Sequence, residues 1–406
     1  MITQRFTDGT DAAAELLRRG ELVAVPTETV YGLAADGTNE AAVRALYEVK
    51  GRPEVKPLSL MVAGPEAMEA LCPAVPRAAR VLAERFWPGP LTIVLPARKS
   101  VLSIVRAGGA TVGLRCPDEE HTLRLLRRCA FPLAVPSANP SGCPSPKSAA
   151  EVLAYFDGKI AGVIDGGPCG IGRESTVASV SEEGLRILRP GALSEQTLRR
   201  TLTQSLVLVG ITGGSGVGKS TLRRVLERRG ALVIDADAVY HELCRSDSAM
   251  LSRLAERFPG AVVDGVLQRG VLGERVFSNP AELAALQAIT DPCVDAEIDR
   301  RLSDFAAAGG RLAAVDAVNL VGTALEPRLQ ALLGVTAPEE IRCERIMQRD
   351  GISRDYALSR IRAQKPDGFY DEHCSHRLHN DGTLERFESE CETILDDIER
   401  TTPWTN

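Results

Sequence analysis

The sequence lacks the features that mark membrane-bound and secreted proteins. No apolar stretch approaches the roughly 18 residues needed to cross a bilayer, and the opening MITQRFTDGTD has no basic segment followed by an apolar one. We therefore expect neither a membrane span nor a signal peptide. No Cys-x-x-Cys pair occurs among the ten scattered cysteines, which we expect to be reduced and mostly buried thiols. The cytoplasm is the expected compartment.

A strong excess of charge of one sign is also absent. The net charge is -6, with 24 basic and 22 acidic side chains in residues 1–200 and 24 and 32 in the remainder. A dedicated nucleic-acid-binding protein would carry a strongly basic surface, so we expect no strong direct nucleic-acid footprint. A length of 406 residues predicts two or three domains, at a typical size of about 150 residues each.

Short apolar runs rich in Val, Ile and Leu alternate with segments of helical period, a pattern typical of α/β proteins. In the first half, strand-like runs occupy residues 21–26, 57–62, 91–97, 111–117 and 132–137, and helical patterns occupy residues 40–50 and 120–129. Residues 175–189 predict a hairpin that turns at Glu183-Gly184, so the first sheet should be mixed rather than purely parallel. We predict two domains, residues 1–200 and 206–406, joined by a polar helical segment at 194–205.

The stretch GGSGVGKS fits the phosphate-binding pattern G-x-x-x-x-G-K-[ST], with an apolar strand before it and a helical pattern after it. Such a loop points backbone N–H groups at a polyphosphate, its lysine reaches the outer phosphates, and its Ser hydroxyl ligates Mg²⁺. A glycine-rich turn with a chance Lys-Ser is the alternative, and the flanking strand and helix disfavour it. We predict a site for ATP with Mg²⁺ on Ser220, and the nucleotide-binding residues are Gly213, Gly214, Ser215, Gly216, Val217, Gly218, Lys219, Ser220 and Thr221.

Two carboxylates follow the next apolar run, in VIDAD. The run predicts a strand that ends in Asp235-Ala-Asp237, and its period of two places both carboxylates on one face at its carboxyl end. One could orient or deprotonate an acceptor hydroxyl and the other could hold a magnesium-bound water, which makes both catalytic candidates together with Lys219. The alternative is a helix N-cap aspartate with a solvated neighbour. The sequence leaves open which of the two accepts the proton.

Residues 206 to about 400 resemble the dephospho-CoA kinases, because TGGSGVGKST, VIDAD, RVFSNPAELAALQAIT, IRCERIMQRDGIS and RIRAQK occur in that family's order. The resemblance implies a parallel sheet flanked by helices, and transfer of the ATP γ-phosphoryl group to the ribose 3′-hydroxyl of dephospho-CoA. It also implies a mobile lid around residues 349–365, in which Arg349, Arg360 and Lys365 neutralise phosphate charge.

Three positions depart from the kinase family pattern, namely His241, Asp291 and Ala317. Because the family uses these places for acceptor binding, they leave the acceptor's identity open. A second hypothesis follows, in which this half is a nucleotide-binding regulator without catalysis. The run HCSHRLHND raises a further question, because His373, His376 and His379 could bind zinc on one helical face. Leu378 and Asn380 instead favour a short strand and turn.

The first half carries polar clusters beside its apolar runs. Lys50 and Arg52 flank a glycine in KGRP, a pattern suited to binding phosphates, although alone it is more typical of a surface turn with two solvated cations. Ser137 and Asn139 follow another apolar run in VPSANPSG. The segments ESTV and LRPG add Ser175, Thr176 and Arg189.

Together with PTETVYGLA, WPGPLT and GLRCP, these segments resemble the YrdC/TsaC family of threonylcarbamoyl-AMP synthases over residues 8–200. The resemblance implies a twisted mixed sheet with helices, and condensation of L-threonine, bicarbonate and ATP for a tRNA modification, with the tRNA modification machinery as a partner. Lys50, Arg52 and Arg189 would then be the cations around ATP, with Ser137 and Asn139 as hydrogen-bond partners, and Lys50 and Arg52 also catalytic. Candidates for threonine binding are Thr27, Thr29, Arg115, Ser175 and Thr176. An RNA-binding module is the alternative.

Overall fold

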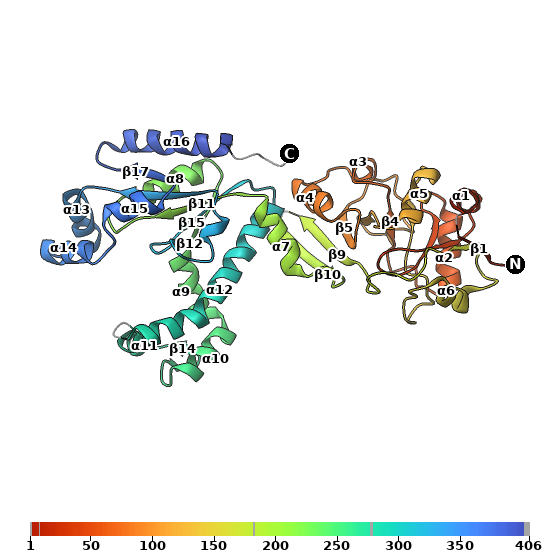
Figure 1. The fold of residues 1–406 in the computed structure, drawn as a ribbon, viewed down its shortest axis with the longest axis horizontal. Helices are drawn as coiled ribbons and strands as arrows, with labels where there is room; N and C mark the ends of the chain where they lie inside the picture. The colour runs from red at the N-terminus through yellow and green to blue at the C-terminus, as the bar shows by residue number, and fades with distance from the viewer. Residues whose placement is uncertain (1, 8, 182, 277–278, 402–406) are drawn as a thin grey trace. The chain divides into compact units, whose positions relative to one another are not determined.

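The computed structural model describes residues 2–7, 9–181, 183–276 and 279–401. The chain forms two compact units, residues 1–202 with 307–309 and residues 203–306 with 310–406 (Figure 1). Within the described ranges, no helix has both the length and the apolar character needed to cross a membrane.

The first unit is built on a ten-stranded sheet in the order β1-β8-β2-β3-β7-β4-β6-β5-β9-β10. Parallel pairs such as β4–β6 and antiparallel pairs such as β5–β6 both occur, which confirms the expected mixed sheet. Its elements are β1 (Gln4–Phe6), α1 (Thr10–Arg18), β2 (Val23–Val25), β3 (Gly32–Asp36), α2 (Glu40–Lys50), β4 (Ser59–Met61), α3 (Ala67–Leu71), α4 (Arg77–Phe86), β5 (Leu91–Pro96), β6 (Thr111–Arg115), α5 (Glu120–Cys129), β7 (Leu133–Ala134), α6 (Ala149–Phe156), β8 (Gly162–Ile164), β9 (Thr176–Ser181), β10 (Gly184–Arg189) and α7 (Glu195–Gln204).

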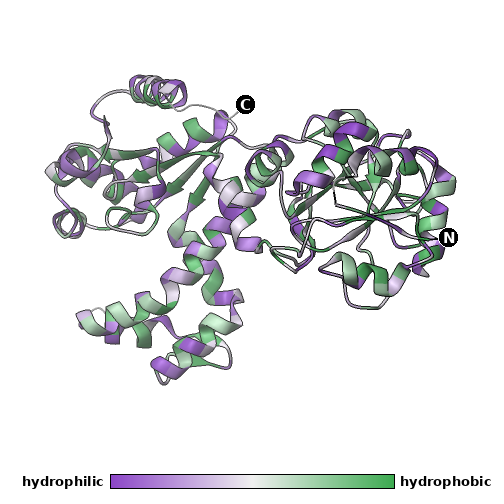
Figure 2. Ribbon diagram, turned by 45° about the vertical axis from the view of Figure 1, so that its right-hand side comes forward, coloured by the Kyte–Doolittle hydropathy of each residue, from purple (hydrophilic) through white to green (hydrophobic). Residues whose placement is uncertain are grey.

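The sequence predicted many of these elements closely. The helices at 40–50 and 120–129 are α2 and α5, and the hairpin is the antiparallel pair β9–β10. Gly184 already pairs with Ser181, so the chain turns before Gly184 rather than at it. Figure 2 shows purple and green alternating around most helices, as expected where one side of each helix is buried.

One face of the first sheet is only partly covered. Apolar residues of α1 and α5, such as Leu17 and Leu125, pack with Val23 of β2 and Leu133 of β7. Met61 of β4 belongs to this core, and it pairs in register with Arg115 of β6. Because alternate residues of a strand share a face, Arg115 and its neighbours on β5 and β9 continue the same face beyond the helices. This uncovered stretch is where a cavity forms.

The second unit contains a five-stranded parallel sheet in the order β12-β15-β11-β16-β17. Its elements are β11 (Val207–Thr212), α8 (Lys219–Arg228), β12 (Leu232–Asp235), α9 (Ala236–Ser246), α10 (Ser248–Arg257), β13 (Val262–Val263), β14 (Val266–Leu267), α11 (Arg269–Val276), α12 (Pro280–Ala307), β15 (Leu312–Asp316), η1 (Glu326–Arg328), β16 (Ala331–Thr336), α13 (Glu339–Asp350), α14 (Arg354–Arg362), α15 (Asp367–His373), β17 (His376–His379) and α16 (Leu384–Thr401).

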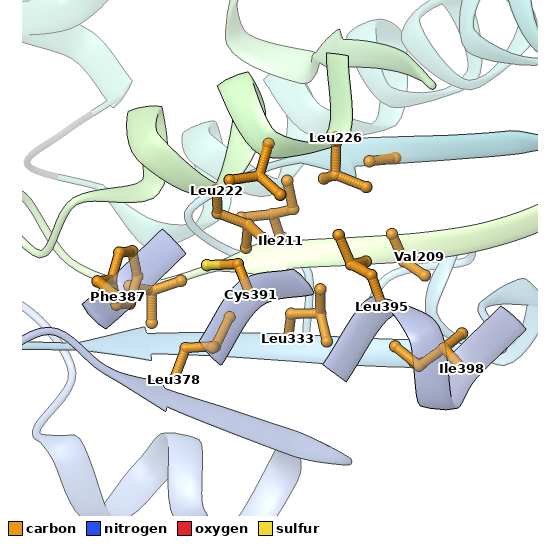
Figure 3. Packing of buried hydrophobic residues seen from close by; sticks show 14 of the residues in the cluster. Val209, Ile211, Leu222, Leu226, Leu333, Leu378, Phe387, Cys391, Leu395 and Ile398 are labelled. Atoms are coloured by element: carbon orange, nitrogen blue, oxygen red, sulfur yellow. The ribbon is translucent and has the colours of Figure 1, made fainter. Parts of the chain in front are cut away.

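Helices α8 and α16 cover one face of this sheet. Figure 3 shows Leu222 and Leu226 of α8 with Phe387, Cys391 and Leu395 of α16 over the buried strands. A second apolar cluster joins α9–α12 around Met250 and Phe258. The core fixes the carboxyl ends of β11, β12 and β15 beside one another, because these strands are parallel and paired. The polar residues predicted for phosphoryl transfer follow those ends.

Candidate active sites

A cavity of about 620 Å³ lies on the uncovered part of the first sheet. Its floor includes Ser59, Gly113 and Val94, which form one row of paired residues across β4, β6 and β5. The cavity brings together seven of the residues predicted for the first site: Lys50, Arg52, Arg115, Ser137, Asn139, Ser175 and Arg189.

Lys50 is the last residue of α2. The Asn39 side chain caps the start of this helix, and Gly51 ends it in the left-handed conformation at φ 58°, where a glycine carries no steric penalty. The Lys50 ammonium group donates hydrogen bonds to the backbone carbonyls of Ser137 and Asn139, and the Ser141 N–H donates to the Lys50 carbonyl over 2.8 Å. Lys50 therefore ties the end of the helix to the polar loop, and both line the cavity.

Lys50 as a residue is 3% exposed, and this burial affects the charge of its ammonium group. Burial first, and then the neighbouring Arg52, lower the pKa of Lys50 to about 7, against the opposite effect of Glu174. The charge on Lys50 is thus sensitive to whatever enters the cavity. An anion would favour the protonated form.

Arg189 reaches the cavity through contacts with its neighbours. Its Nη1 lies 2.6 Å from Glu174 Oε2, and its Nη2 donates to the Ser175 carbonyl and hydroxyl at 2.8 and 3.1 Å. Glu174 also accepts a hydrogen bond from the Ser145 hydroxyl over 2.9 Å. Among the described residues, Glu174 is the only carboxylate lining this cavity, against five cationic side chains. The sequence prediction missed it, although it directly precedes Ser175.

Two further polar groups face the same cavity. Arg52 donates to the Pro57 carbonyl over 2.9 Å. Lys56 lines the same cavity, and the sequence prediction missed it. Asn139 donates through Nδ2 to the Cys143 carbonyl over 2.6 Å, whereas its buried Oδ1 has no hydrogen-bond partner among the described residues. A buried acceptor without a partner is costly, and a ligand donor would satisfy it.

The threonine candidates separate into two groups. Arg115 lines the cavity, and its Nη2 donates to Glu28 at 2.7 Å and to the Thr29 hydroxyl at 2.9 Å. Thr27 and Thr29 do not line the cavity, and their hydroxyls hydrogen-bond each other. Through Thr29 they hold the Arg115 side chain in place. Ser175 lines the cavity beside Thr92. The fully buried Thr176 does not, because its hydroxyl bonds the Leu193 carbonyl over 2.7 Å.

In the second unit, the predicted phosphate loop connects β11 to α8. Gly218 has φ 100°, and a Cβ there would lie 2.2 Å from Asn380 Nδ2, so only glycine fits. Lys219 begins α8, and its Nζ donates to the Gly213 carbonyl over 2.8 Å. This hydrogen bond ties the start of α8 to the first glycine of the loop.

The prediction that both aspartates lie on one face of a strand is wrong. Strand β12 ends at Asp235, whose side chain accepts from the Ala238 N–H and caps α9, and Asp237 lies exposed in the first turn of that helix. The alternative of a cap with a solvated neighbour describes the local structure. Burial alone would raise the pKa of Asp235, but the Ala238 N–H and Arg223 lower it below its ordinary value.

The sequence prediction missed Asp316 at the end of β15. Its carboxylate lies 3.9 Å from Lys219 Nζ and 3.4 Å from Arg223 Nη1, and Arg223 also bonds Asp235 at 2.9 Å. Burial raises the pKa of Asp316, while Lys219 and Arg223 oppose that effect. The parallel strands β12, β15 and β11 thus bring Asp316 to the lysine of the phosphate loop, and Arg223 contacts both Asp316 and Asp235.

The chemistry of these donors fits a magnesium ion. Mg²⁺ prefers carboxylate and hydroxyl oxygens and keeps several waters. The exposed hydroxyl of Ser220 follows Lys219, and the carboxylate of Asp316 lies beside that lysine. Oxygen donors of the required type are therefore available at the loop.

The lid candidates have other partners. Arg349 and Arg360 both bond Asp350, whose pKa falls to about 2 because of Arg349 first and Arg360 second. Lys365 lies over the Phe369 ring at 4.9 Å. The three cations line neither of the two cavities described here. Among the described residues, none of the hydrogen bonds or ring contacts of these three cations involves the phosphate loop, and their role toward phosphate stays a prediction.

A second cavity, of about 630 Å³, lies between α9, α12 and the segment after β15. Asp237, Asp291 and Asp295 line it, whereas no lysine or arginine among the described residues does. Burial first raises the pKa of both Asp291 and Asp295, and Asp291 adds to the effect on Asp295. Of the three departures from the family pattern, Asp291 and Ala317 line this cavity, and the exposed His241 does not.

The histidine run forms a strand, as its apolar and turn residues favoured. His376 and His379 begin and end β17, while His373 ends α15. Within the described residues, no group of three or more His, Cys, Asp or Glu side chains is arranged to hold a metal ion.

Comparisons with known proteins match each half separately. Residues 15–191 match the model of the Sua5/YciO/YrdC family, described as telomere recombination, and residues 207–386 match the model described as dephospho-CoA kinase. A threonylcarbamoyl-AMP synthase of Bacillus subtilis (strain 168) is 47% identical over 191 residues, which are 47% of this chain and 55% of that protein.

Two relatives are covered almost completely. A putative threonylcarbamoyl-AMP synthase of Mycobacterium tuberculosis (strain ATCC 25618 / H37Rv) is 34% identical over 194 residues, which are 48% of this chain and 89% of that protein. A dephospho-CoA kinase of Deinococcus radiodurans is 37% identical over 193 residues, 48% of this chain and 93% of that protein. By contrast, this chain spans about half the length of the Bacillus relative.

The buried Lys50 generates a prediction about pH. Because its pKa is about 7 in the free chain, protonation is lost as pH rises through 7, and binding of a polyphosphate anion such as ATP in this cavity should take up a proton. We expect the affinity to fall by up to about tenfold per pH unit above 7, relative to Lys50→Arg, which stays charged. Calorimetric titration in two buffers of different ionisation enthalpy measures the proton uptake. Equal uptake by the wild type and Lys50→Arg would contradict the role of Lys50.

Proposed function

Since the chain belongs to the threonylcarbamoyl-AMP synthase family through its first half and to the dephospho-CoA kinase family through its second half, we propose that it is a bifunctional ATP-dependent enzyme. Residues 1–200 would form threonylcarbamoyl-adenylate, and residues 206–406 would phosphorylate dephospho-CoA. The observation that carries the proposal is that each unit has its own polar cavity and its own lysine anchored in a polar loop.

In the first unit, the proposed substrates are L-threonine, bicarbonate and ATP. The threonine amine and bicarbonate first form a carbamate, in which a C–N bond forms and water leaves. An oxygen of this carbamate then attacks the α-phosphorus of ATP, a P–O bond forms, and the bond to the leaving pyrophosphate breaks. Lys50, Arg52 and Arg189 are the cations available to neutralise the triphosphate and the leaving group. Arg115 is the candidate for the threonine carboxylate, and Thr27 and Thr29 keep it oriented.

The buried Asn139 Oδ1 and the Ser137 hydroxyl supply hydrogen-bonding groups at the other wall of the same cavity. Catalysis here rests on positioning and charge neutralisation, since Glu174, the one lining carboxylate in the described part of the chain, is paired with Arg189. The product would serve tRNA modification, which makes that machinery the expected partner.

In the second unit, the acceptor hydroxyl attacks the γ-phosphorus of ATP, its proton passes to a carboxylate, and ADP leaves. Asp237 lines the acidic cavity, whereas Asp235 is engaged as a helix cap and with Arg223, so Asp237 is the better base. Lys219 and the loop N–H groups hold the phosphates. A Mg²⁺ bound at Ser220 and Asp316 would neutralise phosphate charge.

The two activities should fail independently. Lys50→Ala is expected to abolish pyrophosphate release that depends on threonine and bicarbonate, and to leave phosphorylation of dephospho-CoA intact. Lys219→Ala should abolish phosphorylation of dephospho-CoA and leave pyrophosphate release intact. Each lysine belongs to a site that one unit alone builds. Both rates are measured on the same preparation. Loss of both activities in either variant would contradict independent sites.

The assignment of the base can be tested by comparing the two aspartates. Asp237→Asn should lower kcat of the kinase by about 100-fold or more, the usual contribution of a general base. Asp235→Asn should lower kcat less, because asparagine caps a helix as well as aspartate does. The comparison uses saturating ATP and dephospho-CoA. A larger loss from Asp235→Asn would overturn the assignment.

The acidic cavity predicts an effect on acceptor binding. Dephospho-CoA carries negative charge, so Asp291→Asn should lower its KM about fivefold and leave the KM of ATP unchanged. The matched control is Asp264→Asn, an exposed aspartate in the turn between β13 and β14. An unchanged or raised KM for dephospho-CoA would show that Asp291 does not oppose this acceptor.

A further inference from the structure

Three carbonyl groups of the phosphate loop point toward α13. Arg342 Nε donates to the Ser215 carbonyl over 3.0 Å, and Arg345 Nη1 donates to the carbonyls of Gly216 and Val217 over 3.2 and 3.4 Å. The loop therefore presents three successive carbonyls to two guanidinium groups of one helix.

This arrangement fixes the direction of the next three N–H groups. Across a trans peptide bond, a carbonyl and the following N–H point to opposite sides. The N–H groups of Gly216, Val217 and Gly218 must therefore face away from α13. These are the groups that a phosphate-binding loop directs at its anion.

Gln364 holds the start of the loop from a second direction. Its Oε1 accepts from the Ser215 N–H over 2.9 Å and from Arg342 Nη2 over 2.8 Å, and its Nε2 donates to the Ser215 hydroxyl over 2.9 Å. Ser215 is thus bound at its amide, its carbonyl and its hydroxyl by two side chains. Neither side chain was predicted from the sequence to have a role at the site.

Both side chains are supported by packed structure. Arg342 is 5% exposed, and Gln364 follows α14, which packs on α13 through Ala357 and Ile361 against Cys343 and Ile346. The Gln364 N–H also bonds the Ile361 carbonyl over 3.1 Å. The end of α14 and the phosphate loop are therefore held together in a defined geometry.

We propose that Arg342 and Gln364 are positioning residues for phosphoryl transfer, which hold Ser215 so that the loop N–H groups are preset for the ATP triphosphate. The proposal rests on the proposed kinase function. Neither side chain needs to touch ATP. Their contribution is preorganisation, because an ordered loop loses less conformational freedom when the nucleotide binds.

The test is a steady-state comparison of full-length variants. Gln364→Ala should raise the KM of ATP about tenfold, the effect of losing the two hydrogen bonds that hold Ser215, each of ordinary net strength. The KM of dephospho-CoA and kcat should change little. Gln348→Ala, at an exposed position of α13, is the matched control, and the thermal unfolding curve of each full-length variant reports that the second unit is folded.

A second variant separates positioning from a merely structural role. Gln364→Glu can still accept from Ser215 and pair with Arg342, so it should preserve stability. It cannot donate to the Ser215 hydroxyl, and it brings negative charge to the loop, so the KM of ATP should rise at least as much as in Gln364→Ala. An unchanged KM of ATP in Gln364→Ala, or equal rises in both substrate KM values, would overturn the proposal.

The outcome does not depend on the acceptor. If the wild-type chain failed to phosphorylate dephospho-CoA, the proposed acceptor would be wrong. The role of Gln364 would then be measured by equilibrium titration with Mg-ATP. Binding at the phosphate loop is identified as the part of the binding that is lost in Lys219→Ala. Gln364→Ala must weaken that binding by a similar factor, and unchanged affinity would refute the positioning role.

Discussion

A lysine ammonium group anchored on backbone carbonyls is the interaction on which both units depend. Lys50 bonds the carbonyls of Ser137 and Asn139, and Lys219 bonds the Gly213 carbonyl. In each unit the lysine belongs to a helix end and the carbonyls to a polar loop, so one contact fixes both. An ammonium group has three donors, and those not used by the carbonyls remain for an anion.

The helix termini use this interaction differently. Lys219 begins α8, where the helix adds positive potential to that of the lysine. Lys50 ends α2, where the helix carbonyls carry partial negative charge and favour a cation but do not themselves attract an anion. The first unit therefore needs more side-chain charge around its cavity, and Arg52, Lys56, Arg115 and Arg189 provide it.

The sequence predicted those candidate site residues that occur in short local motifs. The helix at 40–50, the phosphate loop and the polar loop after β7 could be predicted because glycine and capping residues act locally. Asp316 could not be predicted in this way, because it reaches Lys219 only through the pairing of β11 and β15, nearly a hundred residues apart in the sequence. Asp237 was misplaced because the chain enters α9 directly after Asp235, and an alternating pattern of two residues is too short to distinguish a strand from a first helical turn.

The cations predicted for the lid show a second limit of prediction from sequence. Arg349 and Arg360 have the charge that phosphates require, but Asp350 lies between them and pairs with both. The presence of a cation in a sequence motif therefore does not show whether that cation is free to bind phosphate. The uncharged Gln364 contacts the loop instead, because its position after α14 is set by the packing of α13 and α14.

The charges of the second unit are divided between the phosphate loop and the acidic cavity. Lys219 and Arg223 lie with Asp316 near the phosphate loop, whereas the adjoining cavity is lined by Asp237, Asp291 and Asp295. Like charges repel more strongly where water is partly excluded, so a triphosphate is favoured at the loop and disfavoured in the cavity. Under the proposed function, this division directs ATP to the donor position. It also requires the charged diphosphate of dephospho-CoA to lie away from the three carboxylates, with the uncharged hydroxyl-bearing part of the acceptor nearest Asp237.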